Sequence, residues 1–147
     1  MKNWVKYILL LVLVSLLVLI RAYESELFYD PLIEYFKNNY LYSEMPEVDT
    51  WRLMTGILFR YALNSLVSLA IIYVAFQNIR HVKFTGFFMM VSFLILMFVF
   101  VYLLRGKFEE GYLFPFYIRR FLIHPMFLLI LFPSFYFLKL RRRQYLK

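Results

Sequence analysis

The stretch that decides the fold is FTGFFMMVSFLILMFVFVYLL, residues Phe84 to Leu104, which contains no charged side chain. A helix that crosses a membrane needs about 20 mostly apolar residues, and this stretch is long enough. Three further stretches have a similar character: Trp4 to Ile20, Gly56 to Phe76 and Phe121 to Leu138. The last of them is interrupted by His124, Pro125 and Pro133. The pattern predicts an all-α integral membrane protein in which residues 1–147 form one domain with four transmembrane helices.

Composition supports a membrane location and excludes several classes of protein. Hydrophobic residues make up 63% of the chain and aromatic residues 22%, whereas only 18% are charged. A soluble chain of this length has too small an interior to bury so much apolar surface. The absence of cysteine excludes disulfides, cysteine-ligated metal sites and a cysteine nucleophile. The net charge is +8, but the basic residues flank the apolar stretches, so the expected partner is a lipid bilayer and not nucleic acid.

The distribution of charges predicts how the helices are oriented. All acidic residues fall in two connecting segments, the loop of residues 21–50 and the short loop before the fourth span. The amino end, the turn after the second span and the carboxy-terminal tail contain Lys and Arg but no acid. Because cytoplasmic segments carry the excess of Lys and Arg, we expect both termini in the cytoplasm. No small-x-small cleavage site follows the first span, so we expect a retained helix and not a cleaved signal peptide.

The first outer loop, residues 21–50, contains the signature of a short helix. Asp30 is a typical N-cap, and the proline that follows it suits the first position of a helix. Four apolar residues then recur on one face: Leu32, Ile33, Phe36 and Tyr40. We expect a short interfacial helix with this face against the membrane, and the alternative is an extended, aromatic-rich loop packed on the bundle. A second cap, Asp49 or Thr50, precedes the second span.

Polar residues within and beside the spans are the candidate functional residues. Ionisable side chains in a membrane are costly and usually face protein or a water-filled cavity. The second span has small and polar residues at intervals of four, which places them on one helix face inside the bundle: Gly56, Arg60, Asn64 and Ser68. His124 lies one turn below Arg120, at a depth similar to that of Arg60. We expect a polar cluster to converge beneath the outer surface: Arg21, Glu24, Asp30, Arg60, Asn64, Arg119, Arg120 and His124.

The members of this polar cluster also have structural interpretations. Arg60 can snorkel to the surface, or it can pair with Asp30 or Glu24 and hold the outer loop. His124 can hydrogen-bond a carbonyl freed by Pro125. The arginines at positions 119–120 can anchor to phosphate headgroups. The chain has no HExxH, GxSxG or P-loop motif, so we expect no catalytic residue, no metal site and no cofactor.

Three stretches in order carry a resemblance to a known family: Arg21-Ala22-Tyr23-Glu24 with Leu27 to Pro31, Phe59-Arg60-Tyr61 with Leu63-Asn64, and Arg119 to Ile123 with Pro125, Pro133, Phe135 and Tyr136. Together with the four-span pattern, they resemble the exosortase F system-associated membrane proteins. The family pattern favours a polar residue such as Gln at position 124, where this chain has His124. The resemblance implies an inner-membrane protein of a Gram-negative cell, found alongside an exosortase-like enzyme. Exosortases resemble multi-span cysteine transpeptidases that process a carboxy-terminal sorting signal at the outer face of that membrane.

We therefore predict a multi-pass inner-membrane accessory of an exosortase F-type sorting system, and not an enzyme. Its expected partner is the exosortase-family enzyme or its sorting-signal substrate, bound through the polar cluster. In this hypothesis Arg60, Arg119 and Arg120 engage a carboxylate or a lipid phosphate, and Asn64 orients Arg60. Two alternatives are an intramembrane enzyme that uses His124 as a general base, and a carrier or binding protein for a small anion or a lipid headgroup.

Overall fold

The computed structural model describes residues 3–28, 30–37, 47, 49–106, 111 and 113–145, and within these ranges the chain forms helices and no strand. In chain order the helices are α1 (Asn3–Ala22), α2 (Glu24–Leu27), α3 (Leu32–Lys37), α4 (Thr50–Phe76), α5 (Ile79–Arg105), α6 (Leu113–Ile123) and α7 (Met126–Tyr145). The all-α fold predicted from the sequence is confirmed.

Three of these helices, α1, α4 and α5, are long and apolar enough to cross a membrane. The pair α6 and α7 passes the same test together, but the two helices are bent by 63° at the break between them. By length and composition, the described residues therefore provide three candidate spans, or four if the bent pair is one span. These helices fit a multi-pass membrane protein. Helix α1 buries none of its residues and exposes large apolar side chains along its length, which suits contact with lipid.

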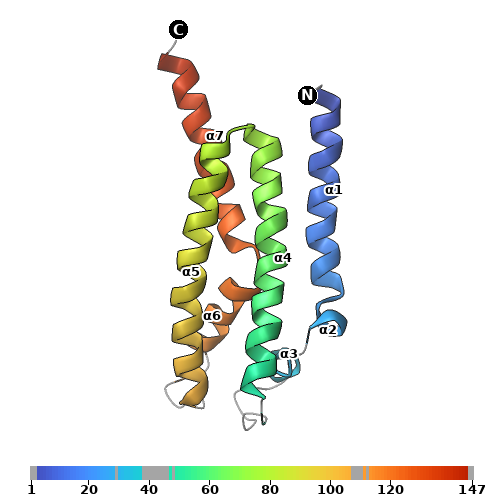
Figure 1. Cartoon of the computed structure of the whole chain (residues 1–147), viewed down its shortest axis with the longest axis vertical. Helices are drawn as coiled ribbons and strands as arrows, with labels where there is room; N and C mark the ends of the chain where they lie inside the picture. The colour runs from blue at the N-terminus through green and yellow to red at the C-terminus, as the bar shows by residue number, and fades with distance from the viewer. Residues whose placement is uncertain are drawn as a thin grey trace.

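The long helices stand side by side, with α4 between α1 and α5 (Figure 1). The start of α1 and the end of α7 lie at one end of the bundle, whereas α2 and α3 lie at the opposite end (Figure 1). We refer to this opposite end as the α2–α3 end. Which end faces the cytoplasm stays a prediction from the charges.

Side-chain caps begin both central helices. Asp49 is the N-cap of α4, and its carboxylate accepts the backbone N–H of Arg52 at 3.3 Å, which confirms the cap expected at this position. Gln77 ends α4 in the left-handed conformation, with φ 51°, and its N–H donates to the carbonyl of Tyr73. Asn78 then caps α5 by accepting the N–H of Arg80 at 3.0 Å. Two residues therefore suffice to reverse the chain between α4 and α5.

The short helix expected after Asp30 is present as α3. Asp30 Oδ1 accepts the N–H of Leu32 at 3.1 Å, as an N-cap does. Leu32 is fully buried and Tyr35 is 6% exposed, and both belong to an apolar cluster with residues of α4, α5 and α6. The apolar side of α3 thus packs on the bundle. Tyr40 lies outside the described residues, and a location of α3 at the membrane interface stays a prediction.

The fourth apolar stretch forms two helices. The sequence predicts a span over Phe121 to Leu138, whereas α6 already begins at Leu113 and ends before a break at His124 and Pro125. Proline has no N–H and disfavours helical geometry at the residue before it, which explains the break. The second proline, Pro133, lies inside the continuous helix α7. Ser134 Oγ donates to the carbonyl of Ile130 at 2.8 Å beside it, a hydroxyl contact that helps a membrane helix to tolerate proline.

Candidate functional site

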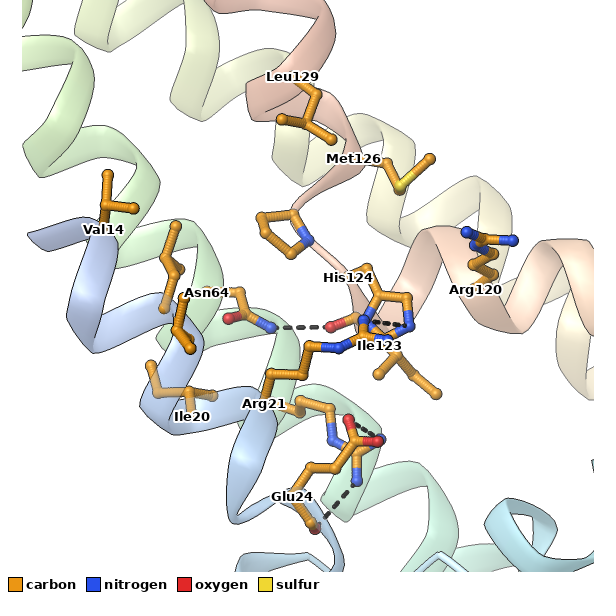
Figure 2. A pocket seen from close by; sticks show the side chains of 14 residues that line it. Val14, Ile20, Arg21, Glu24, Asn64, Arg120, Ile123, His124, Met126 and Leu129 are labelled. Atoms are coloured by element: carbon orange, nitrogen blue, oxygen red, sulfur yellow. Dashed lines mark hydrogen bonds and ion pairs between the residues drawn. The ribbon is translucent and has the colours of Figure 1, made fainter. Parts of the chain in front are cut away.

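The eight residues of the polar cluster lie in one region, where α1, α2 and α4 meet the break between α6 and α7. Figure 2 labels five of them: Arg21, Glu24, Asn64, Arg120 and His124. Six different segments supply the eight residues. Arg21 ends α1, Glu24 begins α2, and Asp30 precedes α3, while Arg60 and Asn64 come from α4. The remaining members are Arg119 and Arg120 at the end of α6, and His124 in the break. Their convergence brings together residues that are up to about a hundred positions apart in the chain.

The Asp30 carboxylate is the centre of the buried part of this cluster. Its Oδ2 lies 3.3 Å from Nη1 of Arg60 and also accepts a hydrogen bond from Nη2 of Arg119. The side chains of Asp30 and Arg60 are each 2% exposed, so this ion pair is almost entirely removed from solvent. Since Oδ1 of the same carboxylate caps α3, Asp30 fixes the first loop to both α4 and α6. The interpretation of Arg60 as a residue that pairs with Asp30 therefore agrees with the geometry.

Arg60 has further partners on the segment that leads out of α1. Its Nη2 donates to the backbone carbonyl of Glu24 at 3.3 Å, and its Nη1 lies 3.9 Å from the Glu24 carboxylate. The guanidinium carbon lies 5.1 Å from the centre of the Phe28 ring, a cation–π distance. The Nε of Arg60 is buried and has no hydrogen-bond partner among the described residues. Sequence reasoning missed Phe28 as a site residue, because nothing in its spacing separates it from the other aromatic residues of the loop.

Asn64 supports the break between α6 and α7. Its Nδ2 donates to the carbonyl of Ile123 at 2.8 Å, and its own backbone carbonyl accepts the hydroxyl of Ser68 at 2.7 Å. Asn64 is 7% exposed and Ser68 is fully buried, so the polar face of α4 does lie inside the bundle. The expected role of Asn64 was to orient Arg60. Its hydrogen bond goes instead to the last carbonyl of α6, the type of contact that the sequence suggested for His124.

His124 contacts the end of α1. Nη1 of Arg21 lies 3.0 Å from both ring nitrogens of His124, so the guanidinium donates to whichever nitrogen carries the lone pair (Figure 2). This contact joins α1 to the break directly. Arg120 comes from the far side of His124 and is exposed. The cluster thus has two kinds of arginine: a buried pair held by Asp30, and two exposed residues, Arg21 and Arg120, at its rim.

A pocket of about 320 Å³ opens beside the cluster. Its walls come from α1, α2, α4 and the break: Val14, Leu17, Val18, Ile20, Arg21, Glu24, Arg60, Asn64, Arg120, Ile123, His124, Pro125, Met126 and Leu129. A second pocket of about 270 Å³ shares Arg21, Glu24, Arg120, Ile123 and His124 with the first, and adds Phe116 and Arg119. We call the first one the α1–α7 pocket. The two pockets are adjacent, because they share these five residues.

The electrostatics of this region favour an anion. Four arginines and two carboxylates belong to the cluster, so its formal charge is positive by two when His124 is neutral. Guanidinium groups bind carboxylates and phosphates in a planar, often bidentate geometry. Among the described residues there is no group of three or more Asp, Glu or His side chains placed to hold a metal ion. The chemistry that these side chains offer is therefore anion binding by hydrogen bonds and charge.

No protein-family model matches the chain, and no curated protein or solved structure matches it either. Membership of the exosortase F system-associated family therefore rests on the resemblance alone and stays a prediction.

Proposed function

We propose that the protein is a non-catalytic inner-membrane accessory of an exosortase F-type sorting system, and that it binds the enzyme or its sorting-signal substrate through the polar cluster. The observation that carries this proposal is the excess of arginine over carboxylate within the polar cluster, which lies toward the α2–α3 end of the bundle. A partner that complements this excess presents a carboxylate or another anionic group. In the proposed orientation this end faces the outer side of the inner membrane, where exosortases process their substrates.

The two kinds of arginine have different parts in this proposal. Arg60 and Arg119 share Asp30, so part of their charge is balanced within the chain and they hold the first loop in place. Arg120 and Arg21 are both exposed and line both pockets, but Arg21 already donates to His124, so Arg120 is the arginine best placed to meet a group from outside. We expect the buried pair to shape the surface and Arg120 to contact the partner.

The alternative of an enzyme with His124 as the general base has weaker support. A general base needs an accessible lone pair within reach of the proton that it removes. The Arg21 guanidinium donates to the ring of His124 and engages this lone pair. A binding role for the cluster requires no such free base, so the contact between Arg21 and His124 favours the accessory over the enzyme.

The experiment is an affinity pull-down of the tagged protein from native membranes, scored together with processing of a sorting-signal reporter. Arg120→Gln should weaken recovery of the exosortase about tenfold or more, because a charge-assisted hydrogen bond contributes about 1.5–3 kcal/mol. Arg105→Gln is the matched control, since Arg105 is exposed at the end of α5, near the same end of the bundle, and lines neither pocket. His124→Gln should leave both recovery and processing intact. Loss of processing in His124→Gln, with normal folding and normal recovery of the partner, would contradict the accessory role and favour the enzyme.

A further inference from the structure

The α1–α7 pocket has two chemically different halves. One half consists of charged and polar side chains at the end of α1, on α4 and at the end of α6. The other half consists of aliphatic side chains of α1 and α7: Val14, Leu17, Val18, Met126 and Leu129. In the close-up, Val14 and Leu129 lie on one side of His124, and Glu24 lies on the other (Figure 2). A pocket with this division suits a ligand that is itself charged at one end and apolar at the other.

The charged half of the α1–α7 pocket is suited to binding an anion. Arg21, Arg60 and Arg120 line it together with one carboxylate, Glu24, which leaves an excess of positive charge. Arg60 is 2% exposed, and its Nε has no hydrogen-bond partner among the described residues. A buried donor without a partner is costly, and an acceptor oxygen from a ligand would remove that cost. Arg21 on α1 and Arg120 on α6 lie on the two sides of His124, so they can bind the anionic group of a ligand from two sides (Figure 2).

The apolar half extends into the region that a bilayer covers. At about 1.5 Å of rise per residue, Val14 lies about 10 Å along α1 from Arg21, and Leu129 lies about 4.5 Å along α7 from Met126, where this helix begins. Helix α1 packs chiefly on α4 and does not pack closely on α7. The pocket is partly open, which leaves a hydrocarbon chain a path between these two helices toward lipid.

We infer that the α1–α7 pocket binds an anionic phospholipid, with its phosphate at the arginines and the first part of an acyl chain between α1 and α7. The volume supports a headgroup with the start of a chain. A space of about 320 Å³ is equivalent to about ten water molecules at their share of liquid volume, which is more than a free phosphate fills. The remainder of the chain lies in the surrounding bilayer. This inference concerns the purified protein and does not depend on the proposed accessory function.

The test measures binding of soluble, short-chain lipids to the full-length protein in a mild detergent. The probes are dioctanoyl phosphatidic acid, dioctanoyl phosphatidylcholine and glycerol phosphate, which separate the contributions of charge and chain. Binding is read as the rise of the melting temperature with probe concentration, followed by intrinsic fluorescence, because a ligand that binds only the folded state raises that temperature. Phosphatidic acid should bind at least tenfold more tightly than either of the other two probes.

Two pairs of variants assign this binding to the pocket. Arg120→Gln should weaken phosphatidic acid about tenfold, whereas Arg105→Gln, which changes an exposed arginine outside the pocket, should not. Val18→Trp should fill the apolar half and weaken phosphatidic acid by a similar factor, whereas Val12→Trp should not. Both valines belong to α1 and are exposed, 61% for Val18 and 54% for Val12, so a larger side chain can be accommodated at either position.

Three results would overturn the inference. Equal affinity for phosphatidic acid and glycerol phosphate would show that the acyl chain contributes nothing and that the pocket binds a free anion. Equal affinity for phosphatidic acid and phosphatidylcholine would remove the role of the charged half. Identical binding by the pocket variants and their controls would place the lipid elsewhere on the protein. None of these results depends on recovery of an exosortase, so a failure here and a failure of the accessory proposal are distinguishable.

Discussion

Asp30→Asn tests whether the buried ion pairs stabilise the fold. The substitution removes one negative charge but keeps an oxygen that can accept the N–H of Leu32, and Asn caps helices about as well as Asp. It therefore leaves α3 capped and isolates the effect of charge. The two guanidinium groups of Arg60 and Arg119 would then face each other across a neutral amide, with only the more distant Glu24 carboxylate beside Arg60.

The expected magnitude follows from burial. The side chains of Asp30 and Arg60 are each 2% exposed and that of Arg119 is 11% exposed, so solvent screens the remaining charges poorly. Removing one partner of a buried ion pair costs about 3–5 kcal/mol. For a chain of about this length, 1 kcal/mol changes the melting temperature by about 2–4 °C, so Asp30→Asn should lower it by about 6–20 °C.

Asp49→Asn is the matched control, because Asp49 is also an N-cap with an arginine partner. Its ion pair with Arg52 is exposed, with a distance of 3.9 Å and side-chain exposures of 54% and 73%. Such a pair contributes about 0–1 kcal/mol, so the melting temperature should change by at most a few degrees. The assay is thermal unfolding in detergent, followed by intrinsic fluorescence. Arg60→Met should lower the melting temperature less in the Asp30→Asn variant than in the unchanged protein, because the two residues are coupled. Equal melting temperatures for Asp30→Asn and Asp49→Asn would refute the argument that burial strengthens this ion pair.

Three further changes test other parts of the structure. Asn64→Leu leaves the Ile123 carbonyl without its donor and should lower the free energy of unfolding by about 1–3 kcal/mol, whereas Ser134→Ala, which removes an exposed hydroxyl contact on α7, should change it by at most about 0.5 kcal/mol. Thr85→Val should be neutral or stabilising, because the Thr85 hydroxyl is fully buried and has no hydrogen-bond partner among the described residues; clear destabilisation would reveal a partner. Since the chain has no cysteine, single cysteines at Ser25 and Gln144 report the orientation, and only the first should react with an impermeant reagent in intact spheroplasts. Labelling of the cysteine at position 144 from outside would reverse the predicted topology.

The sequence was sufficient to predict the three long apolar helices and the caps of α3 and α4, because these depend on local signals. Long apolar runs mark α1, α4 and α5, and the Asp49 and Asp30 caps are recognisable from single residues and their neighbours. The four-residue spacing on α4 identified Arg60 and Asn64 as buried, since a helix repeats its faces at nearly that interval. For Arg60 the sequence left open whether it snorkels or pairs with Asp30 or Glu24, and the structure brings it closer to Asp30 than to Glu24.

The contacts across the break were beyond sequence reasoning because they depend on how α6 crosses α4. The predicted fourth span began at Phe121, and residues 113–120, which contain a proline and end in two arginines, gave no sign that α6 starts eight residues earlier. The partner of Asn64 is a backbone carbonyl, which carries no signal in a side-chain pattern. The apolar wall of the α1–α7 pocket was equally hidden, because Val14 and Val18 resemble every other aliphatic residue of α1.

The break at Pro125 connects the fold to the site. A continuous helix from α6 into α7 would satisfy the Ile123 carbonyl within its own backbone, and Asn64 would then have no acceptor there. Because proline interrupts the helix, this carbonyl becomes available, and Asn64 on α4 binds it and holds the end of α6 in place. With the end of α6 held in this position, His124 contacts Arg21 and Arg119 donates to Asp30. The break at Pro125 therefore positions His124 and the end of α6 within the polar cluster, and replacing Pro125 should disturb the cluster more than replacing Pro133, which lies inside a continuous helix.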